Sequence, residues 1–406
     1  MPVTRRAVLG STLAATALPI VRARAQAPKI TIGVLNDQSG AYRDISGPVS
    51  VECARQAIEE FGGAHGFTID LVSADHQNKP DIATSIAREW FDKGVDLLID
   101  VPASSVGLAV QSVAKEKNKV YINTGSATSA LTGGQCSPNC VHWVYDTYML
   151  SKSTGGAMVK TGGDTWFFVT ADYAFGHQLQ SDTTAMIQAA GGKVVGSVAY
   201  PFPDTTDFSS LLIQAQASGA KVLGLANAGA DTINSVKQAN EFGLTAKMKV
   251  ATLLVFISDV HALGLDVAKG LVLSASFYWD LNDRTRAFTQ RVLPKLKGIH
   301  PGMNHAGVYS GSLHYLKTAA AMGAGTARAD GRATVARMKA LEVDDDCFGK
   351  THIREDGRNM VEAYLFQVKQ PSESKGPWDY YKLLATTPAD QAFRPLADGH
   401  CAFVKA

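Results

Sequence analysis

The chain of 406 residues is longer than one ordinary hydrophobic core supports, which predicts at least two lobes. Hydrophobic residues make up 46% and charged residues 19%, a balance that excludes large-scale disorder. The formal net charge is +2, and it becomes −2 when the four arginines of residues 1–25, which include no acid, are removed. A nearly neutral chain lacks the basic surface expected of a nucleic-acid-binding protein.

Residues 1–25 have the pattern of a secretory signal. Arg5-Arg6 is followed by an apolar run over residues 7–18, and A-x-A cleavage patterns occupy residues 23–25 and 25–27. The paired arginines resemble a twin-arginine export signal. The alternative is a membrane anchor, but the run is shorter than the ~20 residues that span a bilayer. We expect export to the periplasm, with cleavage before Gln26 or, alternatively, before Pro28.

Five cysteines in an exported chain predict a disulfide and leave at least one thiol unpaired within the chain. Cys136 and Cys140 are close enough in sequence to close a small loop. Cys347 and Cys401 are a second candidate pair, which would fasten the carboxyl-terminal tail to the body. A metal site made from Cys136, Cys140 and His142 is the alternative for the first pair.

Short apolar strands alternate with amphipathic helices along the first third of the chain. The expected strands are residues 30–35, 68–73, 97–99 and 120–123, and the expected helices are residues 47–61, 81–93 and 106–117. This order predicts an α/β unit with a parallel sheet covered on both faces.

The same alternation starts again after about residue 147. The expected strands are residues 166–170, 194–198, 222–226, 250–252 and 271–274, and the expected helices are residues 175–190, 208–217 and 232–242. Three further helices at 284–296, 306–322 and 332–341 precede a strand at 361–368. The tail contains four prolines, which predicts an irregular segment on the surface.

Five segments carry a family resemblance as a set: residues 33–40, 103–105, 123–128, 172–176 and 229–234. In this order and spacing the chain resembles the branched-chain amino-acid-binding-like group of periplasmic solute-binding proteins, which have the type I fold. The resemblance implies two Rossmann-like lobes with parallel sheets, joined by three crossovers, and a ligand cleft between them. It assigns residues 28–147 and 276–350 to the first lobe, and residues 148–275 and 351–406 to the second. It also implies a monomer that delivers ligand to the membrane permease of an ABC transporter.

The first lobe of the cleft is expected to hold a carboxylate, because ligands bind beyond the carboxyl ends of parallel strands. Ser104 and Ser105 stand before a helix, where free N–H groups and a hydroxyl can bind an anion. A helix N-cap is the alternative role for them. The resemblance favours ligand binding, because the serine after this strand holds a ligand carboxylate in relatives. Ser126 and Thr128 follow the next strand and are expected to complete the site.

Aromatic and polar side chains are expected around the ligand body. Tyr42 is predicted to stack on the ligand and Arg43 to pair with an anion, unless both are simply exposed. Tyr173 and Phe175 are predicted to close from the second lobe, the alternative being a helix cap with a core aromatic ring. Asn227 is predicted as a polar contact or a turn residue.

The class of ligand depends on Asp231. By resemblance it occupies the place of the acid that holds a ligand ammonium, but its position before a helix favours an N-cap. The following stretch 252–256, which includes Leu253, is apolar and contains no other acid. A buried ammonium without a partner is costly, so the sequence favours a carboxylate with an aromatic or branched body, and amino acids remain the alternative.

Nothing in the sequence indicates an enzyme. It has no G-x-S-x-G, H-E-x-x-H or P-loop motif, and its ten histidines show no metal-ligand spacing. We therefore expect no cofactor and no metal ion. A periplasmic sensor that presents its ligand to a receptor is one alternative to a transport protein. An exported enzyme is another, because twin-arginine signals often export proteins that carry cofactors.

Overall fold

The computed structural model describes residues 27–404, so the predicted signal lies outside the described residues. The first sheet is entirely parallel and has the strand order β2-β1-β3-β4-β5. Its strands are β1 (Lys29–Asn36), β2 (Thr68–Asp75), β3 (Leu97–Asp100), β4 (Val120–Asn123) and β5 (Cys140–His142). β3, β4 and β5 are buried along their whole length, as expected of strands covered on both faces.

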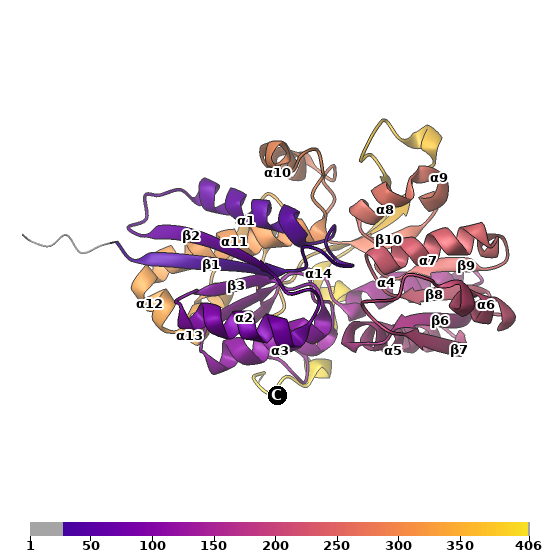
Figure 1. Cartoon of the computed structure of the whole chain (residues 1–406), viewed down its shortest axis with the longest axis horizontal. Helices are drawn as coiled ribbons and strands as arrows, with labels where there is room; N and C mark the ends of the chain where they lie inside the picture. Colours follow the sequence, from indigo (N-terminus) through magenta and orange to yellow (C-terminus); the bar gives the residue numbers. More distant parts are fainter. Residues whose placement is uncertain (1–26, 405–406) are drawn as a thin grey trace, which may run out of the picture.

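Helices cover both faces of this sheet (Figure 1). They are α1 (Gly47–Phe61), α2 (Pro80–Asp92), α3 (Ser104–Glu116), α11 (Met303–Met322), α12 (Ala324–Ala329) and α13 (Gly331–Ala340). α2 packs on α3, and α1 packs on α11. The chain thus returns to its first sheet after some 160 residues spent elsewhere.

The second sheet is also parallel, with the strand order β7-β6-β8-β9. Its strands are β6 (Thr165–Ala171), β7 (Lys193–Tyr200), β8 (Val222–Ala226) and β9 (Lys249–Thr252). The accompanying helices are α4 (Thr147–Lys160), α5 (Ala174–Ala189), α6 (Ser209–Ala217), α7 (Ala230–Glu241), α8 (Ile257–Leu263) and α9 (Leu265–Ala268). The two sheets lie in separate lobes (Figure 1), which confirms the predicted fold class.

A third sheet corrects two predictions. It is antiparallel and consists of β10 (Val272–Ala275), β13 (Ala363–Val368) and β14 (Tyr381–Thr387). The strand expected at 271–274 therefore does not extend the second parallel sheet, and the tail is not irregular. The tail forms a strand because β14 has a hydrogen-bonded partner in β13, which the proline count does not reveal.

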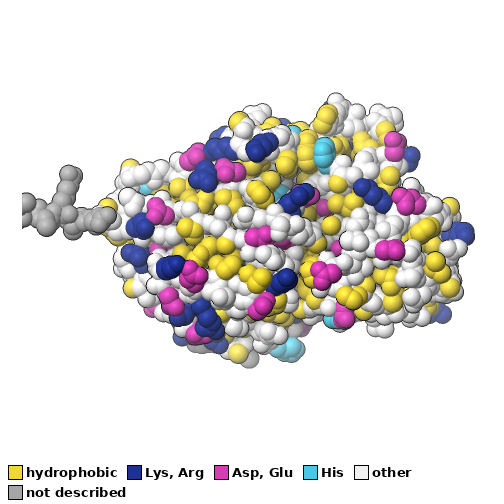
Figure 2. Space-filling model, viewed as in Figure 1, with side chains coloured by type: hydrophobic (Ala, Val, Ile, Leu, Met, Phe, Trp, Pro, Cys, Tyr) yellow, Lys and Arg dark blue, Asp and Glu magenta, His cyan; other side chains and the backbone are white. Residues whose placement is uncertain are grey.

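The remaining elements are short. They are α10 (Asp283–Val292), α14 (Ala389–Ala392) and a two-stranded hairpin of β11 (Val343–Asp345) and β12 (Gly349–Thr351). In the described part of the chain, no helix combines the length and apolar character needed to cross a bilayer. Figure 2 shows acidic and basic side chains interspersed on the visible face.

A buried ion pair joins two of the segments that run between the lobes. Arg358 is fully buried, and its Nη1 lies 3.4 Å from Asp146 Oδ2. Its Nη2 donates to the His142 carbonyl, and its guanidinium lies 4.5 Å from the centre of the Phe393 ring. Burial lowers the pKa of Arg358 to about 10, so it stays charged near neutral pH.

The predicted lobe boundaries remain a prediction.

The disulfide differs from both predicted pairs. Cys136 is bonded to Cys401, and their Cα atoms are 5.6 Å apart. Cys140 lies in β5 and Cys347 in the turn of the β11–β12 hairpin, and both are buried free thiols. The metal site proposed with His142 is also wrong, because the disulfide occupies Cys136. The partners are 265 residues apart in sequence, so local spacing carried no signal for them.

Removing this cross-link is expected to destabilise the protein. In the double variant Cys136→Ser/Cys401→Ser the unfolded chain is less restricted, which should lower the free energy of unfolding by roughly 2–4 kcal/mol. Urea unfolding measures this difference. Dithiothreitol should lower the wild-type midpoint to that of the variant and leave the variant unchanged. Equal midpoints for the oxidised wild type and the variant would contradict the prediction.

Candidate functional site

Loops from the two lobes face each other at the carboxyl ends of their strands. We call the space between them the interlobe cavity. Its lining comes from the segments after β1, β3, β4 and β5 on one side and after β6, β8 and β9 on the other: Tyr42, Ile45, Pro102, Gly125, Ala127, Tyr145, Tyr173, Phe175, Ala228 and Leu254. This is the edge at which parallel α/β sheets bind ligands.

Asp100, the last residue of β3, fixes the loops of the first lobe. Its carboxylate is fully buried and accepts hydrogen bonds from Asn36 Nδ2 (3.0 Å), Ser46 Oγ (2.8 Å), Thr124 Oγ1 (3.2 Å) and Asn304 Nδ2 (2.9 Å). Burial raises the pKa of Asp100, and the hydrogen bonds from Asn304, Asn36 and Ser46 oppose that rise. Four side chains from three regions of the chain therefore converge on one carboxyl group.

The backbone after β3 is held in an unusual conformation. Asp100 and Val101 have φ values of 90° and 59°, a region that non-glycine residues rarely occupy. The Ser126 hydroxyl lies 2.5 Å from the Val101 carbonyl oxygen and 2.9 Å from that of Ala103. A Cβ on Gly125 would lie 2.6 Å from Pro102 Cα, so only glycine permits this approach.

Ser104 is the first residue of α3, and it does not cap that helix. Ala103 occupies the N-cap position without a side-chain cap, so the alternative role as an N-cap is wrong. The buried Ser104 hydroxyl accepts a hydrogen bond from the Thr128 backbone N–H at 3.2 Å. No acceptor for its own proton is found within residues 27–404. This proton and the first N–H groups of α3 can serve an anion.

Tyr42 is placed by a buried acid. Asp37 accepts hydrogen bonds from the backbone N–H groups of Gly40 (2.7 Å) and Tyr42 (2.8 Å). The Tyr42 hydroxyl makes a hydrogen bond with the Tyr173 hydroxyl of the second lobe. Both rings stack on Phe202, with ring centroids 5.1 Å and 4.3 Å away. Residues expected to face the ligand thus contact each other across the lobes.

The lobes also meet through their backbones. The Ala230 N–H donates to the Ala41 carbonyl at 3.0 Å, and a Cβ on Gly229 would lie 2.5 Å from the same oxygen. The interlobe cavity is about 10 Å³, room for roughly one water molecule. The lobes are therefore closed on each other, and a larger ligand requires them to separate.

Asp231 is not a helix cap, which corrects the sequence interpretation. Gly229 takes the N-cap position of α7, and Asp231 Oδ2 accepts a hydrogen bond from the Tyr200 hydroxyl at 2.7 Å. Burial raises the pKa of Asp231 to about 7, although the bond from Tyr200 opposes the rise. Burial, with a smaller contribution from Asp231, raises the pKa values of Tyr42 and Tyr173.

The other predicted site residues lie in different surroundings. Arg43 is exposed and pairs with Asp44, away from the cavity lining. Ser105 is half-buried in the first turn of α3. Asn227 is bonded within its own lobe to Ser235 and Thr232, so it braces the turn before α7. Leu253 is buried, but its neighbour Leu254 lines the cavity.

Sequence reasoning missed several residues of this region. Ile45, Pro102, Tyr145 and Ala228 line the cavity, and Phe202 stacks beside it. Pro102 and Ala228 directly follow strand ends, so their positions carried a usable signal. Tyr145 and Phe202 lie in irregular segments whose approach depends on tertiary packing. Within residues 27–404, no cluster of three or more His, Cys, Asp or Glu side chains is suited to a metal ion.

Comparison with known proteins identifies the family. A family model described as periplasmic binding protein matches residues 29–377, and the chain belongs to this family. Its ABC-transporter members are substrate-binding proteins rather than enzymes, and their location is extracytoplasmic. No curated protein sequence matches the chain.

Solved structures agree with this assignment. A periplasmic binding protein from Burkholderia mallei is 48% identical, covers 93% of this chain and 100% of its own, and superposes with a TM-score of 0.89. A branched-chain amino acid ABC transporter periplasmic ligand-binding protein from Burkholderia xenovorans is 40% identical, with 92% and 99% coverage and a TM-score of 0.80.

A more distant structure shows the fold alone. A solute-binding protein of an ABC transporter from R. palustris, in complex with benzoate, is 20% identical. It covers 89% of this chain and 97% of its own, with a TM-score of 0.78.

Enlarging Gly229 is expected to keep the lobes apart. In Gly229→Ala the added Cβ meets the Ala41 carbonyl, so small-angle scattering should give a larger radius of gyration than for the wild type. Gly243→Ala is the matched control, because Gly243 also has a positive φ but has open space around its Cβ position. A radius of gyration equal to that of the wild type in Gly229→Ala would contradict the observed approach.

Proposed function

We propose that the protein is the ligand receptor of an ABC transporter and that it captures a small carboxylate with an aromatic or branched apolar body. The observation that carries this proposal is the contrast across the interlobe cavity. The Ser104 hydroxyl and the first N–H groups of α3 follow the lining residue Pro102, and Thr128 follows the lining residue Ala127. The lining itself is made mainly of aromatic and aliphatic side chains. A carboxylate needs the hydrogen-bond donors, and an apolar ligand body needs the aromatic and aliphatic lining.

The donors suit a carboxylate because they are fixed before a ligand arrives. The Asp100 hydrogen bonds and the Ser126 contacts hold the start of α3. Ligand binding therefore carries only a small entropic cost for ordering these donors. A carboxylate there would receive the Ser104 hydroxyl proton and the N–H groups of the first turn of α3.

The small volume supports a ligand that binds by lobe closure. Tyr42 and Tyr173 come from opposite lobes and contact each other, so a ligand between them must part the lobes and then be enclosed. Closure around a ligand would give a membrane permease a distinct surface to recognise. We infer that the protein acts as a monomer and delivers its ligand to that permease.

A second candidate is an α-amino acid, and Asp231 is the specific observation in its favour. The side chain is buried, accepts one hydrogen bond from Tyr200 and is not used as a cap. An ionised Asp231 could pair with a ligand ammonium, whereas a protonated Asp231 could donate to a neutral ligand oxygen. The two classes of ligand therefore require opposite protonation states of the same residue.

Ser104→Ala tests whether Ser104 binds the carboxylate of the ligand. It removes one charge-assisted hydrogen bond and should weaken binding of the ligand by roughly 1.5–3 kcal/mol, about ten- to a hundredfold. Calorimetry measures the change. Ser112→Ala on the same helix is the control, since its hydroxyl donates to the Leu108 carbonyl within that helix, and it should bind as the wild type does. Unchanged affinity in Ser104→Ala would remove that residue from the site.

The pH dependence of affinity distinguishes the two ligand classes. Asp231, with a pKa of about 7, gains negative charge as pH rises from 6 to 8. A carboxylate without an amine should then bind more weakly, by up to about tenfold per pH unit, because a second anion faces it. An α-amino acid should bind more tightly over the same range. Calorimetry at several pH values measures the slope.

Asp231→Asn is the control for this slope, because it cannot ionise. A flat profile in the variant assigns the wild-type slope to Asp231. A slope that persists in the variant belongs to another group, such as Asp259, whose pKa burial also raises to about 7. An affinity for the amine-free acid that rises with pH in the wild type would contradict the leading proposal.

A further inference from the structure

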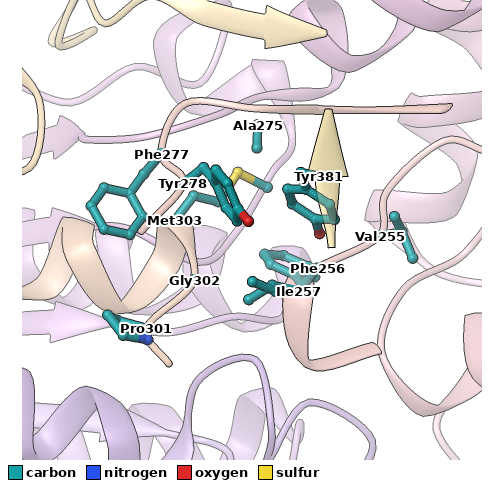
Figure 3. Close-up of a pocket in the computed structure, with 10 residues that line it drawn as sticks. All are labelled: Val255, Phe256, Ile257, Ala275, Phe277, Tyr278, Pro301, Gly302, Met303 and Tyr381. Atoms are coloured by element: carbon teal, nitrogen blue, oxygen red, sulfur yellow. The ribbon is translucent and has the colours of Figure 1, made fainter. Parts of the chain in front are cut away.

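A second enclosed space, which we call the Tyr381 cavity, lies beside the interlobe cavity. Segments 255–257, 275–278 and 301–303 form it together with Tyr381 of β14 (Figure 3). Its volume is about 10 Å³, which is enough for roughly one water-sized group. The segments come from the start of α8, the loop after β10 and the start of α11, so both lobes contribute to it.

Phe256 stands between the two cavities. Its ring lines the Tyr381 cavity and makes an edge contact with Tyr145, at a centroid separation of 5.7 Å. Tyr145 and Leu254 line the interlobe cavity on the other side. The Phe256 backbone N–H donates to Asp259 Oδ2 at 2.9 Å, which holds this residue at the start of α8. Motion of one ring would therefore join the two spaces.

Tyr381 gives the second cavity a polar group without a partner. Its side chain is 95% buried, from a relative exposure of 5%, and its hydroxyl has no hydrogen-bond partner within residues 27–404. Figure 3 shows the hydroxyl end of the ring turned toward Phe256 and Ile257. By contrast, the Tyr278 hydroxyl in the same cavity donates to the Trp378 carbonyl at 3.3 Å. A buried hydroxyl is normally bonded, so this exception indicates a missing polar partner.

We propose that the Tyr381 cavity is a subsite for the far end of the ligand, which Tyr381 recognises through a hydroxyl or carbonyl oxygen. The inference rests on the proposed function, because it treats the carboxylate at Ser104 as the near end. It narrows the ligand class to elongated acids with an apolar middle and a second oxygen. Phe256 sets the length of ligand that the closed lobes admit.

The unbonded Tyr381 hydroxyl and the volume of the Tyr381 cavity both suit a single oxygen atom of a ligand. The lining is otherwise apolar, so a charged end would be buried without a counter-ion. A methyl end would fill the space but leave the Tyr381 hydroxyl unbonded. A hydroxyl or carbonyl end fills the space and satisfies the hydroxyl.

A matched pair of acids tests the subsite: 3-(4-hydroxyphenyl)propionate and 3-phenylpropionate, measured by calorimetry. The wild type should bind the hydroxylated acid about tenfold more tightly, the value of one buried hydrogen bond. Tyr381→Phe should lose that preference and leave the affinity for 3-phenylpropionate unchanged. Tyr315→Phe is the control and should keep the preference, because the Tyr315 hydroxyl is also buried without a partner within residues 27–404 but does not line the Tyr381 cavity. A preference that survives in Tyr381→Phe, or its absence in the wild type, overturns the subsite.

Phe256→Ala tests the length limit. The smaller side chain should open the space between the two cavities. The ratio of the affinity for 5-phenylpentanoate to that for 3-phenylpropionate should then be higher in the variant than in the wild type. An unchanged ratio would show that Phe256 does not limit ligand length.

A neutral probe separates the failure of this inference from failure of the proposed function. 4-Fluorophenol has the hydroxyl but no carboxylate, and fluorine resonance reports its binding. Suppose that no acid binds the wild type, and that 4-fluorophenol binds the wild type but not Tyr381→Phe. This result would support the subsite and contradict the proposed function. If no acid binds and 4-fluorophenol also fails to distinguish the two proteins, both the subsite and the proposed function are contradicted.

Discussion

The buried carboxylate of Asp100 is the constraint on which the candidate site depends. It ends β3 and binds side chains from the end of β1, from the cap of α1, from the loop after β4 and from the start of α11. These donors come from three regions that are far apart in sequence, and each would be costly to bury without an acceptor. Because the donors share one acceptor, the loops that carry Ile45, Ser104 and Thr128 are anchored to a single buried side chain.

The second lobe meets this fixed surface with small and aromatic residues. Gly229 admits the Ala41 carbonyl, and Tyr173 reaches Tyr42. Neither contact buries a charged group, so separating the lobes exposes mainly apolar rings and a few hydrogen bonds. Such an interface suits a clamp that must open and close, since no costly buried ion pair has to break. The buried Arg358–Asp146 pair instead lies within the segments that join the lobes, where it can stay intact.

Much of the fold could be predicted from the sequence, because α/β units bury continuous apolar strands between glycine-bounded helices. The expected strand at 222–226 matches β8, and the expected helix at 47–61 matches α1. The predictions that failed concerned contacts between residues distant in sequence. β14 forms a strand only because it pairs with β13, and Cys136 is bonded to Cys401 only because the tail returns to the turn before β5.

The candidate site was predictable to the level of its loops rather than its side chains. Strand ends located Tyr42, Ser104 and Tyr173 near the cleft, but not the direction of each side chain. Asp231 was interpreted as a cap because acids favour that position, and the structure gives the position to Gly229. Arg43 lies next to Tyr42 in sequence, yet its exposed side chain pairs with Asp44, whereas Asp37 binds the Tyr42 backbone N–H.

The central claim is that the first lobe binds a carboxylate at Ser104 and the start of α3. Calorimetry can compare the tightest-binding member of a panel of aromatic and branched acids with its own primary amide, which keeps the shape and removes the charge. The account predicts that the acid binds at least about tenfold more tightly, since charge-assisted hydrogen bonds exceed neutral ones by this amount or more. Equal or tighter binding of the amide would contradict it.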